Sequence, residues 1–422
     1  TTASENTAVG SKSLSGVTTG NSNTGVGAFA GLSITTGTNN VAVGPYALTT
    51  MTTSDYNTAV GRAAGRYITT GFDNTLIGGL AGDALTDADY NTAIGKEALT
   101  SDTLGSRSTA VGWSALANQN FTSATNSYNT AMGFQAGLSV TTGTTNTLIG
   151  GLSGDAITTA SSNTAVGYSS LGVNTTGAFN TAIGYASLDA NTTADNNTAV
   201  GYNSLGLNTT GTRNTGLGNN TLQANTTANN NTALGYNAMA LNTTGASNTA
   251  IGKDALDANT TASNNVAVGY ASLEANTTGT TNVAVGANSL DANTTANNNT
   301  AVGYDSLGAN TTGSENTALG RGSLLVNTTG GNNTAVGVNA LDANTTASNN
   351  TAVGKDALTA NTTGTNNVAV GKDALDSNTT GSNNTALGVD TLQANTTASD
   401  STALGHGALA VSTGASNTAV GK

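Results

Sequence analysis

The sequence contains no cysteine, one proline and one histidine, His406, among its 422 residues. Disulfide frameworks are therefore excluded, and enzymes that depend on a thiol or on paired histidines are nearly excluded. Aromatic residues make up 4% of the chain and charged residues 8%, with 11 Lys and Arg against 23 Asp and Glu. Because nucleic-acid binding needs clustered positive charge, we expect no nucleic-acid partner for this acidic chain.

Long apolar stretches and large side chains are also scarce. No apolar run approaches the ~18 residues of a membrane span, so no membrane insertion is expected, and no signal-peptide pattern follows Thr1. What the chain has instead is 55 glycines and many small polar residues. Since several conventional cores could not be filled with such residues, we expect small residues to be buried in a regular way.

One motif accounts for the whole chain. Asn-Thr-Ala-Val-Gly or a close variant occurs 25 times in steps of 17 residues, apart from one step of 21 and a last step of 16. The longer step reflects a four-residue insertion near residues 118–125. We call the glycine that ends each motif the anchor glycine. Residues 1–166 form more divergent repeats, and residues 167–422 form highly regular ones.

This period predicts the fold class. Seventeen residues are too few for a pair of helices, and the recurring glycines would break one. We therefore predict an all-β fold, a parallel β-solenoid of about 25 stacked rungs that continues through residues 1–422 as a single domain. At the usual strand spacing of about 4.7–4.9 Å, such a rod would be roughly 115 Å long.

The motif itself predicts one strand per rung. The residue before the anchor glycine is always apolar, as in Val9, Met132 and Val420, and we expect it to lie inside. Two residues earlier stands Thr or Val, for which we expect partial burial, and the residue between them is usually Ala. Both faces are thus small or apolar, which is typical of a strand covered on both sides.

A coupled substitution supports a packed interior. Most repeats carry Leu four residues after the anchor glycine, as at Leu171 and Leu256. Five repeats carry Gly there and a large aliphatic residue three positions later, which keeps one large residue in each rung. The five pairs are Gly31 with Ile34, Gly65 with Ile68, Gly82 with Leu85, Gly137 with Val140, and Gly154 with Ile157.

Asparagine marks two corners of the rung. The Asn that begins the motif is expected to stack on its equivalents and to hydrogen-bond along the solenoid. At the second corner, Asn-Thr-Thr is followed by Gly or Ala, and we expect left-handed backbone there. We expect equivalent residues of successive rungs to stack on one another and to form a structural ladder. Its representative members are Asn197, Val200, Gly201, Leu205, Asn208, Asn231, Leu234, Gly235, Asn299, Val302, Gly303 and Leu307.

These repeats resemble a known family. Residues 40–44 and 282–286 resemble the core of the YadA-like head repeats in trimeric autotransporter adhesins. Residues 163–177 and 231–245 resemble even more closely the 17-residue repeats of phage tail-fibre and bacterial surface proteins. The resemblance covers essentially the whole chain and implies a left-handed β-roll in a homotrimer. The chain lacks the stalk, membrane anchor and chaperone domain of complete members, and both ends cut into repeats, so we expect the natural chain to be longer or to assemble end to end.

Few residues are candidates for a site, and no cofactor is expected. His406 has no second His or Cys for metal binding or catalysis, so we expect it at a surface or corner. Glu274 stands one rung from Asp257 and Asp291, which makes these three carboxylates the best metal candidates, although we expect them to splay into water. Residues 25–30 match a dinucleotide-binding loop loosely, but the helix that must follow is absent.

Other features are open to two interpretations. Six tyrosines that follow an anchor glycine either form a stripe that stacks on sugars or cover rung edges or a chain interface, and we favour the second interpretation. Trp113 and Phe121 flank the insertion, our first choice for a local binding feature. Fourteen Asn-Thr-Thr corners are formal glycosylation acceptors but also simply good turns. The tyrosines are Tyr168, Tyr185, Tyr202, Tyr236, Tyr270 and Tyr304.

We expect a non-enzymatic structural rod of an extracellular fibre, either the shaft of a phage tail fibre or the head of a cell-surface adhesin. Its partners would be further copies of itself, as a homotrimer or an end-to-end filament, and a surface glycan or host receptor. The alternative is an ice-binding solenoid that uses threonine columns, which requires the Thr face to be exposed and Ala to lie inside. A polysaccharide-cleaving solenoid would need a carboxylate or basic cluster in a groove, and the sequence contains no evident one.

Overall fold

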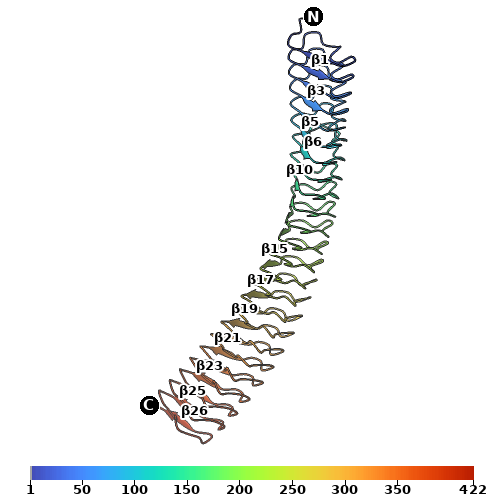
Figure 1. Cartoon of the computed structure of the whole chain (residues 1–422). Helices are drawn as coiled ribbons and strands as arrows, with labels where there is room; N and C mark the ends of the chain where they lie inside the picture. Colours follow the sequence, from blue (N-terminus) through green and yellow to red (C-terminus); the bar gives the residue numbers. More distant parts are fainter. Residues whose placement is uncertain (1) are drawn as a thin grey trace. The chain divides into compact units, whose positions relative to one another are not determined.

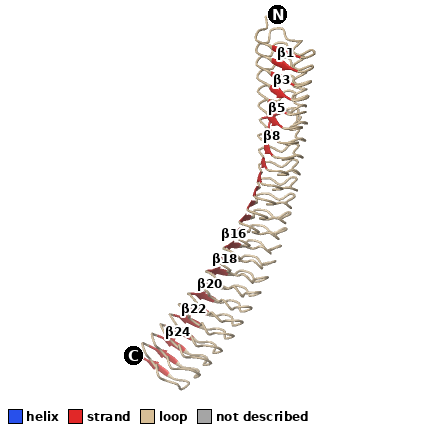
Figure 2. Cartoon of the chain, in the orientation of Figure 1, coloured by secondary structure: helices blue, strands red, loops and turns tan. Residues whose placement is uncertain are grey.

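The computed structural model describes residues 2–422, so Thr1 of the predicted 1–422 solenoid lies outside the described residues. Two compact units are distinguished, Thr1–Arg213 and Asn214–Lys422, and we describe each by itself. Each unit is a parallel β-solenoid in which short strands alternate with loops and turns (Figures 1 and 2). The predicted all-β solenoid with 17-residue spacing is thereby confirmed. Residues 2–422 contain no helix that could span a membrane.

Almost every rung contributes one strand of three residues. In the first unit the strands are β1 (Thr7–Val9), β2 (Thr24–Val26), β3 (Val41–Val43), β4 (Thr58–Val60), β5 (Thr75–Ile77), β6 (Thr92–Ile94), β7 (Gly105–Ser106), β8 (Thr109–Val111), β9 (Thr125–Asn126), β10 (Thr130–Met132), β11 (Thr147–Ile149), β12 (Thr164–Val166), β13 (Thr181–Ile183) and β14 (Thr198–Val200). The two-residue strands β7 and β9 pair with each other beside the insertion.

The second unit contains only three-residue strands. They are β15 (Thr215–Leu217), β16 (Thr232–Leu234), β17 (Thr249–Ile251), β18 (Val266–Val268), β19 (Val283–Val285), β20 (Thr300–Val302), β21 (Thr317–Leu319), β22 (Thr334–Val336), β23 (Thr351–Val353), β24 (Val368–Val370), β25 (Thr385–Leu387), β26 (Thr402–Leu404) and β27 (Thr418–Val420). Within both units, successive strands pair in parallel so that equivalent residues lie side by side, as Ala233 of β16 lies beside Ala250 of β17.

The anchor glycines allow this close stacking. Their φ angles lie between +125° and +145°, a backbone conformation that side chains disfavour. A Cβ atom on Gly78 would lie 2.4 Å from the carbonyl oxygen of Gly95, the next anchor. On Gly252 it would lie 2.2 Å from the carbonyl oxygen of Gly269. Each rung therefore needs glycine at this turn.

The other left-handed residues are not where we predicted them. They stand two, four and twelve residues after the anchor, as at Asp254 (φ 57°), Leu256 (φ 52°) and Asn264 (φ 63°). The Asn-Thr-Thr corner was predicted to be left-handed, and this is wrong, since neither Asn259 nor Gly245 has a positive φ. The corner asparagine turns inward instead, where it forms hydrogen bonds.

The core is one large aliphatic side chain wide. Leu171 and Leu256 are fully buried, as are all five aliphatic residues of the coupled pairs: Ile34, Ile68, Leu85, Val140 and Ile157. The predicted exchange between Leu and Gly is therefore confirmed. A second exchange was not predicted: Leu76 and Leu148 replace the strand Ala, and each packs against glycines of its own and the preceding rung, Gly82 with Gly65 and Gly154 with Gly137.

The predicted orientation of the strand is wrong. The central Ala is the inward residue, fully buried in Ala199 and Ala250 for example, and the residues on either side of it point outward. Val9, predicted to lie inside, is 58% exposed, and Met132 is 46% exposed. The strand is thus covered on one side only. The physical reason is volume, because an interior already filled by one Leu per rung has room for a methyl group beside it.

Candidate functional site

The outward residues of the strands form the most extensive regular surface of each unit. We call this surface the outer sheet face, and it comprises two columns. The threonine column consists of the first strand residue, Thr in most rungs, and the apolar column consists of the residue before the anchor glycine. Side chains of the apolar column are half-buried or exposed, for example 44% in Leu217 and 46% in Leu319. Charged residues do not occur in either column.

Two buried asparagine ladders hold the rungs together behind this face. In the first, the backbone N–H of Asn265 donates to Oδ1 of Asn248 (2.9 Å), and Nδ2 of Asn248 donates to the carbonyl of Ala262 (2.8 Å). In the second, Nδ2 of Asn259 donates to Oδ1 of Asn242 (2.8 Å). Among residues 2–422, no buried side-chain nitrogen or oxygen lacks a hydrogen-bond partner. The predicted hydrogen bonding along the solenoid is confirmed for the Asn that begins the motif, whereas the ladder at the Asn-Thr-Thr corner was not predicted.

The residues predicted to form the structural ladder divide into inner and outer groups. The inner group is fully buried and comprises Asn197, Leu205, Asn208, Asn231, Asn299 and Leu307. The anchors Gly201, Gly235 and Gly303 adopt the left-handed conformation. Val200, Leu234 and Val302 were expected inside and instead belong to the outer apolar column, Leu234 being 41% exposed. They stack along the surface rather than in the core.

The predicted tyrosines form an interrupted column next to the anchor glycines, each about half exposed. In the first unit, the ring of Tyr185 stacks between those of Tyr168 (centroids 5.7 Å apart) and Tyr202 (5.5 Å). In the second, the Nζ atom of Lys253 lies 6.0 Å from the ring centroid of Tyr236 and 5.2 Å from that of Tyr270. The stacked rings turn their faces toward one another, which leaves mainly their edges for a ligand.

The carboxylates of Asp257, Glu274 and Asp291 occupy equivalent positions in successive rungs. Burial raises the pKa of Asp257, and the negative charges of Asp254 and Glu274 raise it further. Burial also raises the pKa of Asp291, with a smaller contribution from Asp305 and Glu274 and partial compensation by backbone N–H groups. No group of three or more His, Cys, Asp or Glu in residues 2–422 is arranged to hold a metal ion. The metal interpretation therefore gains no support.

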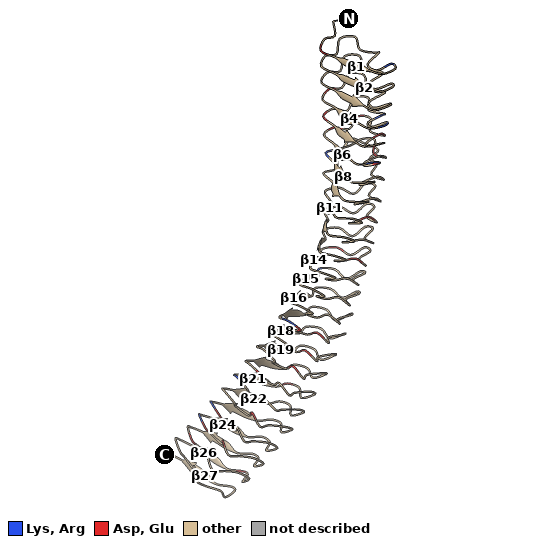
Figure 3. Cartoon of the chain, viewed as in Figure 1, with Lys and Arg blue, Asp and Glu red and all other residues tan. Residues whose placement is uncertain are grey.

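The remaining charges are sparse and lie on the loops (Figure 3). His406 is exposed, and its Nε2 atom lies 4.0 Å from the carboxylate of Asp390. Lys253, Lys355 and Lys372 each form an ion pair with the aspartate that follows. Residues 25–30 run from strand β2 through an anchor glycine into a turn, without a helix, so they do not form a dinucleotide-binding loop.

The insertion contains a polar cluster that sequence reasoning missed. Trp113 is exposed and stacks on Phe134, whereas Phe121 is buried. The fully buried carboxylate of Asp102 lies beside Phe121 and accepts hydrogen bonds from Nε2 of Gln119 (2.6 Å) and from the backbone N–H groups of Gly105 (3.0 Å) and Phe121 (3.2 Å). Asp102 and Gln119 stand seven residues after their anchors, where most rungs carry Asn. That departure from the repeat was the available signal.

The formal glycosylation acceptors lie in the core. All fourteen corner asparagines, from Asn174 to Asn395, are fully buried. In Asn259, Nδ2 donates to both Asn242 and the carbonyl of Ala262. Folded rungs therefore offer no free amide for a glycan at these corners.

The sequence matches no protein-family model and has no significant similarity to a curated protein. The surfaces described above therefore carry the functional argument.

Proposed function

We propose that this chain is a non-enzymatic structural segment of an extracellular fibre, a phage tail-fibre shaft or a cell-surface adhesin head, and that it associates with two further copies of itself. The observation that carries the proposal is the apolar column of the outer sheet face. It runs along every described rung and contains Val, Ile, Leu or Met at each one.

The chemistry of this face favours contact with another protein over contact with water. Continuous exposed apolar surface is uncommon in soluble monomers and marks interaction sites. A column of uncharged aliphatic side chains at the regular spacing of a β-sheet suits an equally regular partner, and another copy of the same chain has the matching period. The methyl groups of the neighbouring threonine column would extend the apolar contact between chains.

The resemblance to YadA-like head repeats and to 17-residue tail-fibre repeats supports the same proposal. It implies a left-handed roll, a homotrimer and an extracellular location, on a virion or a cell surface. The trimer proposed here uses the outer sheet face. The central Ala of each strand is not available for contact between chains, since Ala233 and its equivalents are buried inside their own solenoid.

The mass of the chain in solution tests the proposal. We expect light scattering to give three times the chain mass of 41.0 kDa, and negative-stain images to show uniform rods. A monomer at micromolar concentration would contradict the proposal. Rods that lengthen with concentration would instead favour end-to-end assembly into filaments as the main role.

Ice binding is the second candidate, and one observation favours it. The threonine column is outward-facing while the strand Ala is buried, which is the arrangement that this function requires. Hydroxyl groups at the ~4.8 Å strand spacing could order water along the face. The bulky and variable residues of the apolar column, such as Met132 and Leu217, make the face uneven and disfavour this candidate. Thermal hysteresis in the wild-type chain that disappears in Thr232→Lys and Thr249→Lys would support ice binding over self-association.

A further inference from the structure

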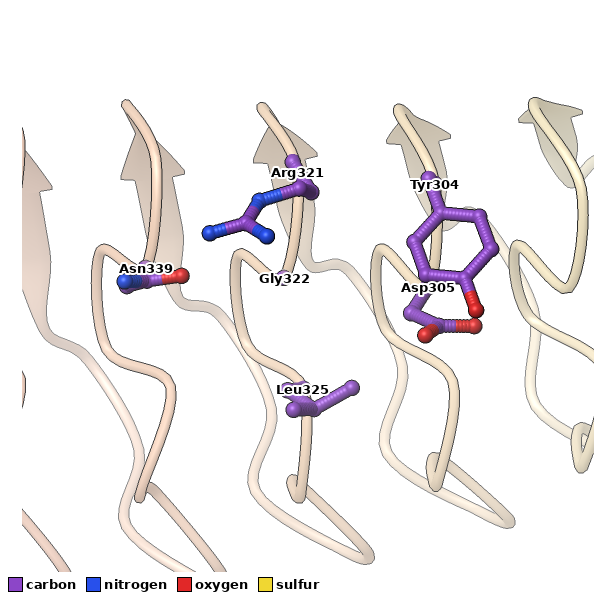
Figure 4. A pocket seen from close by; sticks show the side chains of 6 residues that line it. All are labelled: Tyr304, Asp305, Arg321, Gly322, Leu325 and Asn339. Atoms are coloured by element: carbon purple, nitrogen blue, oxygen red, sulfur yellow. The ribbon is translucent and has the colours of Figure 1, made fainter.

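Two adjoining hollows interrupt the regular surface of the second unit, and Figure 4 shows the residues that line the smaller one. The smaller has a volume of about 120 Å³ and is lined by Tyr304, Asp305, Arg321, Gly322, Leu325 and Asn339. The larger has a volume of about 430 Å³ and shares Asp305 and Leu325 with the first. The volume of the larger hollow falls within the range of about 300–1,000 Å³ that is typical of small-molecule sites, and the volume of the smaller hollow lies below that range.

The hollows arise from two glycines that replace side chains. Gly308 lies at the position that Asp291 occupies one rung earlier, and Gly322 lies at the position that Asp305 and Asn339 occupy in the neighbouring rungs. A Cβ atom on Gly322 would have only Oδ1 of Asn339 within 4 Å, at 3.2 Å. A side chain at Gly322 would therefore make one close contact, with the side-chain amide oxygen of Asn339.

Arg321 is the unusual residue of this site. Lys253, Lys355 and Lys372 occupy the same position in other rungs, and each pairs with the aspartate that follows it. In this rung Gly322 replaces that aspartate, and the guanidinium of Arg321 forms no ion pair with any residue among 2–422. An exposed guanidinium offers a planar set of donors that fits a carboxylate in a bidentate manner.

The other lining residues suit a sugar ring. The exposed ring of Tyr304 offers an aromatic surface against which the C–H groups of a pyranose can pack. Asp305 and the Oδ1 atom of Asn339 accept hydrogen bonds from hydroxyl groups, because Asn339 uses Nδ2 to donate to Asp356 (3.1 Å). Figure 4 shows the Tyr304 ring and the Asp305 carboxylate side by side, with Arg321 on the next rung.

We propose that the smaller hollow, which is lined by Tyr304, Arg321 and Asn339, binds a carboxylated saccharide of the uronic or sialic acid type. The carboxylate of the sugar binds Arg321, its ring packs on Tyr304, and its hydroxyl groups donate to Asp305 and Asn339. The proposal gives the fibre a lateral glycan site, but it depends on residues of one unit and not on the number of chains.

The test measures binding of methyl β-D-glucuronide to the full chain by saturation-transfer NMR, with methyl β-D-glucoside as the neutral match and a methyl sialoside as the second acidic probe. We expect an acidic probe to bind at least tenfold more tightly than the glucoside. Arg321→Ala should weaken that binding at least tenfold, as the loss of charge-assisted hydrogen bonds implies. Lys372→Ala removes a cation at the same position elsewhere and should leave binding unchanged.

Gly322→Asp is the most selective variant. It restores the aspartate that pairs with the cation in other rungs, at a left-handed position where Asp356 and Asp373 already occur. The variant should therefore fold, as far-UV circular dichroism will show, and should lose binding at least tenfold. Equal binding of the neutral and acidic probes, or full binding by Gly322→Asp, would overturn the proposal. Both results are independent of whether the wild-type chain is a trimer.

Discussion

At the scale of the residue, glycine decides whether two rungs can stack. Gly78 and Gly79 are adjacent, yet their surroundings differ completely. Gly78 has a φ of +138° and contacts the backbone of the next rung, whereas a Cβ atom on Gly79 would have no atom within 4 Å. The pair separates the effect of backbone crowding from the general cost of changing a glycine.

We predict that Gly78→Ala destabilises the first unit strongly, by about 3–5 kcal/mol, because the new methyl group collides with the carbonyl of Gly95. Gly79→Ala should change stability by no more than about 0.5 kcal/mol. Thermal unfolding followed by circular dichroism measures both. Equal effects of the two substitutions would show that the left-handed turn adapts to a side chain and does not fix the rung spacing.

The half-buried carboxylates predict a pH effect of definite sign. Since the pKa of Asp257 and that of Asp291 are raised in the folded chain, their ionised forms oppose folding at neutral pH. Asp257→Asn and Asp291→Asn should therefore raise the melting temperature at pH 7. This gain should shrink as the pH falls through the raised pKa and vanish below the pKa of the unfolded chain.

Asp356 serves as a control because its pKa is shifted in the opposite direction. The hydrogen bond from Lys355 lowers the pKa of Asp356, so its ionised form supports folding above the unfolded-state pKa. Asp356→Asn should lower the melting temperature slightly at pH 7, and the difference should disappear in acid. Parallel pH profiles for the variants of Asp257 and Asp356 would contradict this account of the column.

At the scale of the rung, the interior holds one large aliphatic side chain and little more. Leu256→Gly should cost about 2–5 kcal/mol because it leaves a cavity in the second unit. Asn259→Ile alone should also destabilise, since it overfills the rung and removes the hydrogen bonds to Asn242 and from Asn276.

The double variant Leu256→Gly/Asn259→Ile reproduces the natural combination of Gly65 with Ile68. We predict that it recovers at least half of the stability lost in Leu256→Gly, as a thermal double-mutant cycle will measure. Additive losses would mean that the natural pairs depend on their neighbouring rungs, as Gly65 and Gly82 do on Leu76.

The sequence was sufficient for the repeat, the strand and the interior exchange, because each depends on spacing. It was insufficient for the orientation of the strand. Thr-Ala-Val has two outer residues that resemble core residues and a central one that fits either side, so hydrophobicity favoured the wrong face. The orientation of the strand is indicated by Leu76, which replaces the central Ala where Gly65 and Gly82 leave space for a larger side chain. The central residue of the strand therefore lies in the core.

The candidate sites were less predictable still. The ladder asparagines follow from periodicity, whereas the hollow beside Arg321 depends on two glycines in different rungs that the fold brings together. The buried Asp102 contacts Gln119 because the two residues occupy equivalent positions in successive rungs, as the corner asparagines do elsewhere. A repeat makes departures from it informative, but their meaning depends on which rungs are adjacent.

At the scale of the whole molecule, the outer sheet face is the surface whose partner matters most. Val285 and Leu319 stand two rungs apart in the apolar column, and both are exposed. In a monomer, lysine at either position would reach water and cost little. In a trimer that buries the column, each lysine would be an unpaired charge in an apolar interface, with a cost on the order of several kcal/mol.

We therefore predict that Val285→Lys/Leu319→Lys converts the proposed trimer into a folded monomer, as light scattering and circular dichroism together will show. Tyr168→Lys/Tyr202→Lys places the same two charges two rungs apart in the tyrosine column and should leave the trimer intact. If both variants stayed trimeric, another surface would have to join the chains. If both became monomeric, the interface would extend around the anchor turn to the tyrosines, and their stacked edges would then belong to the contact between chains.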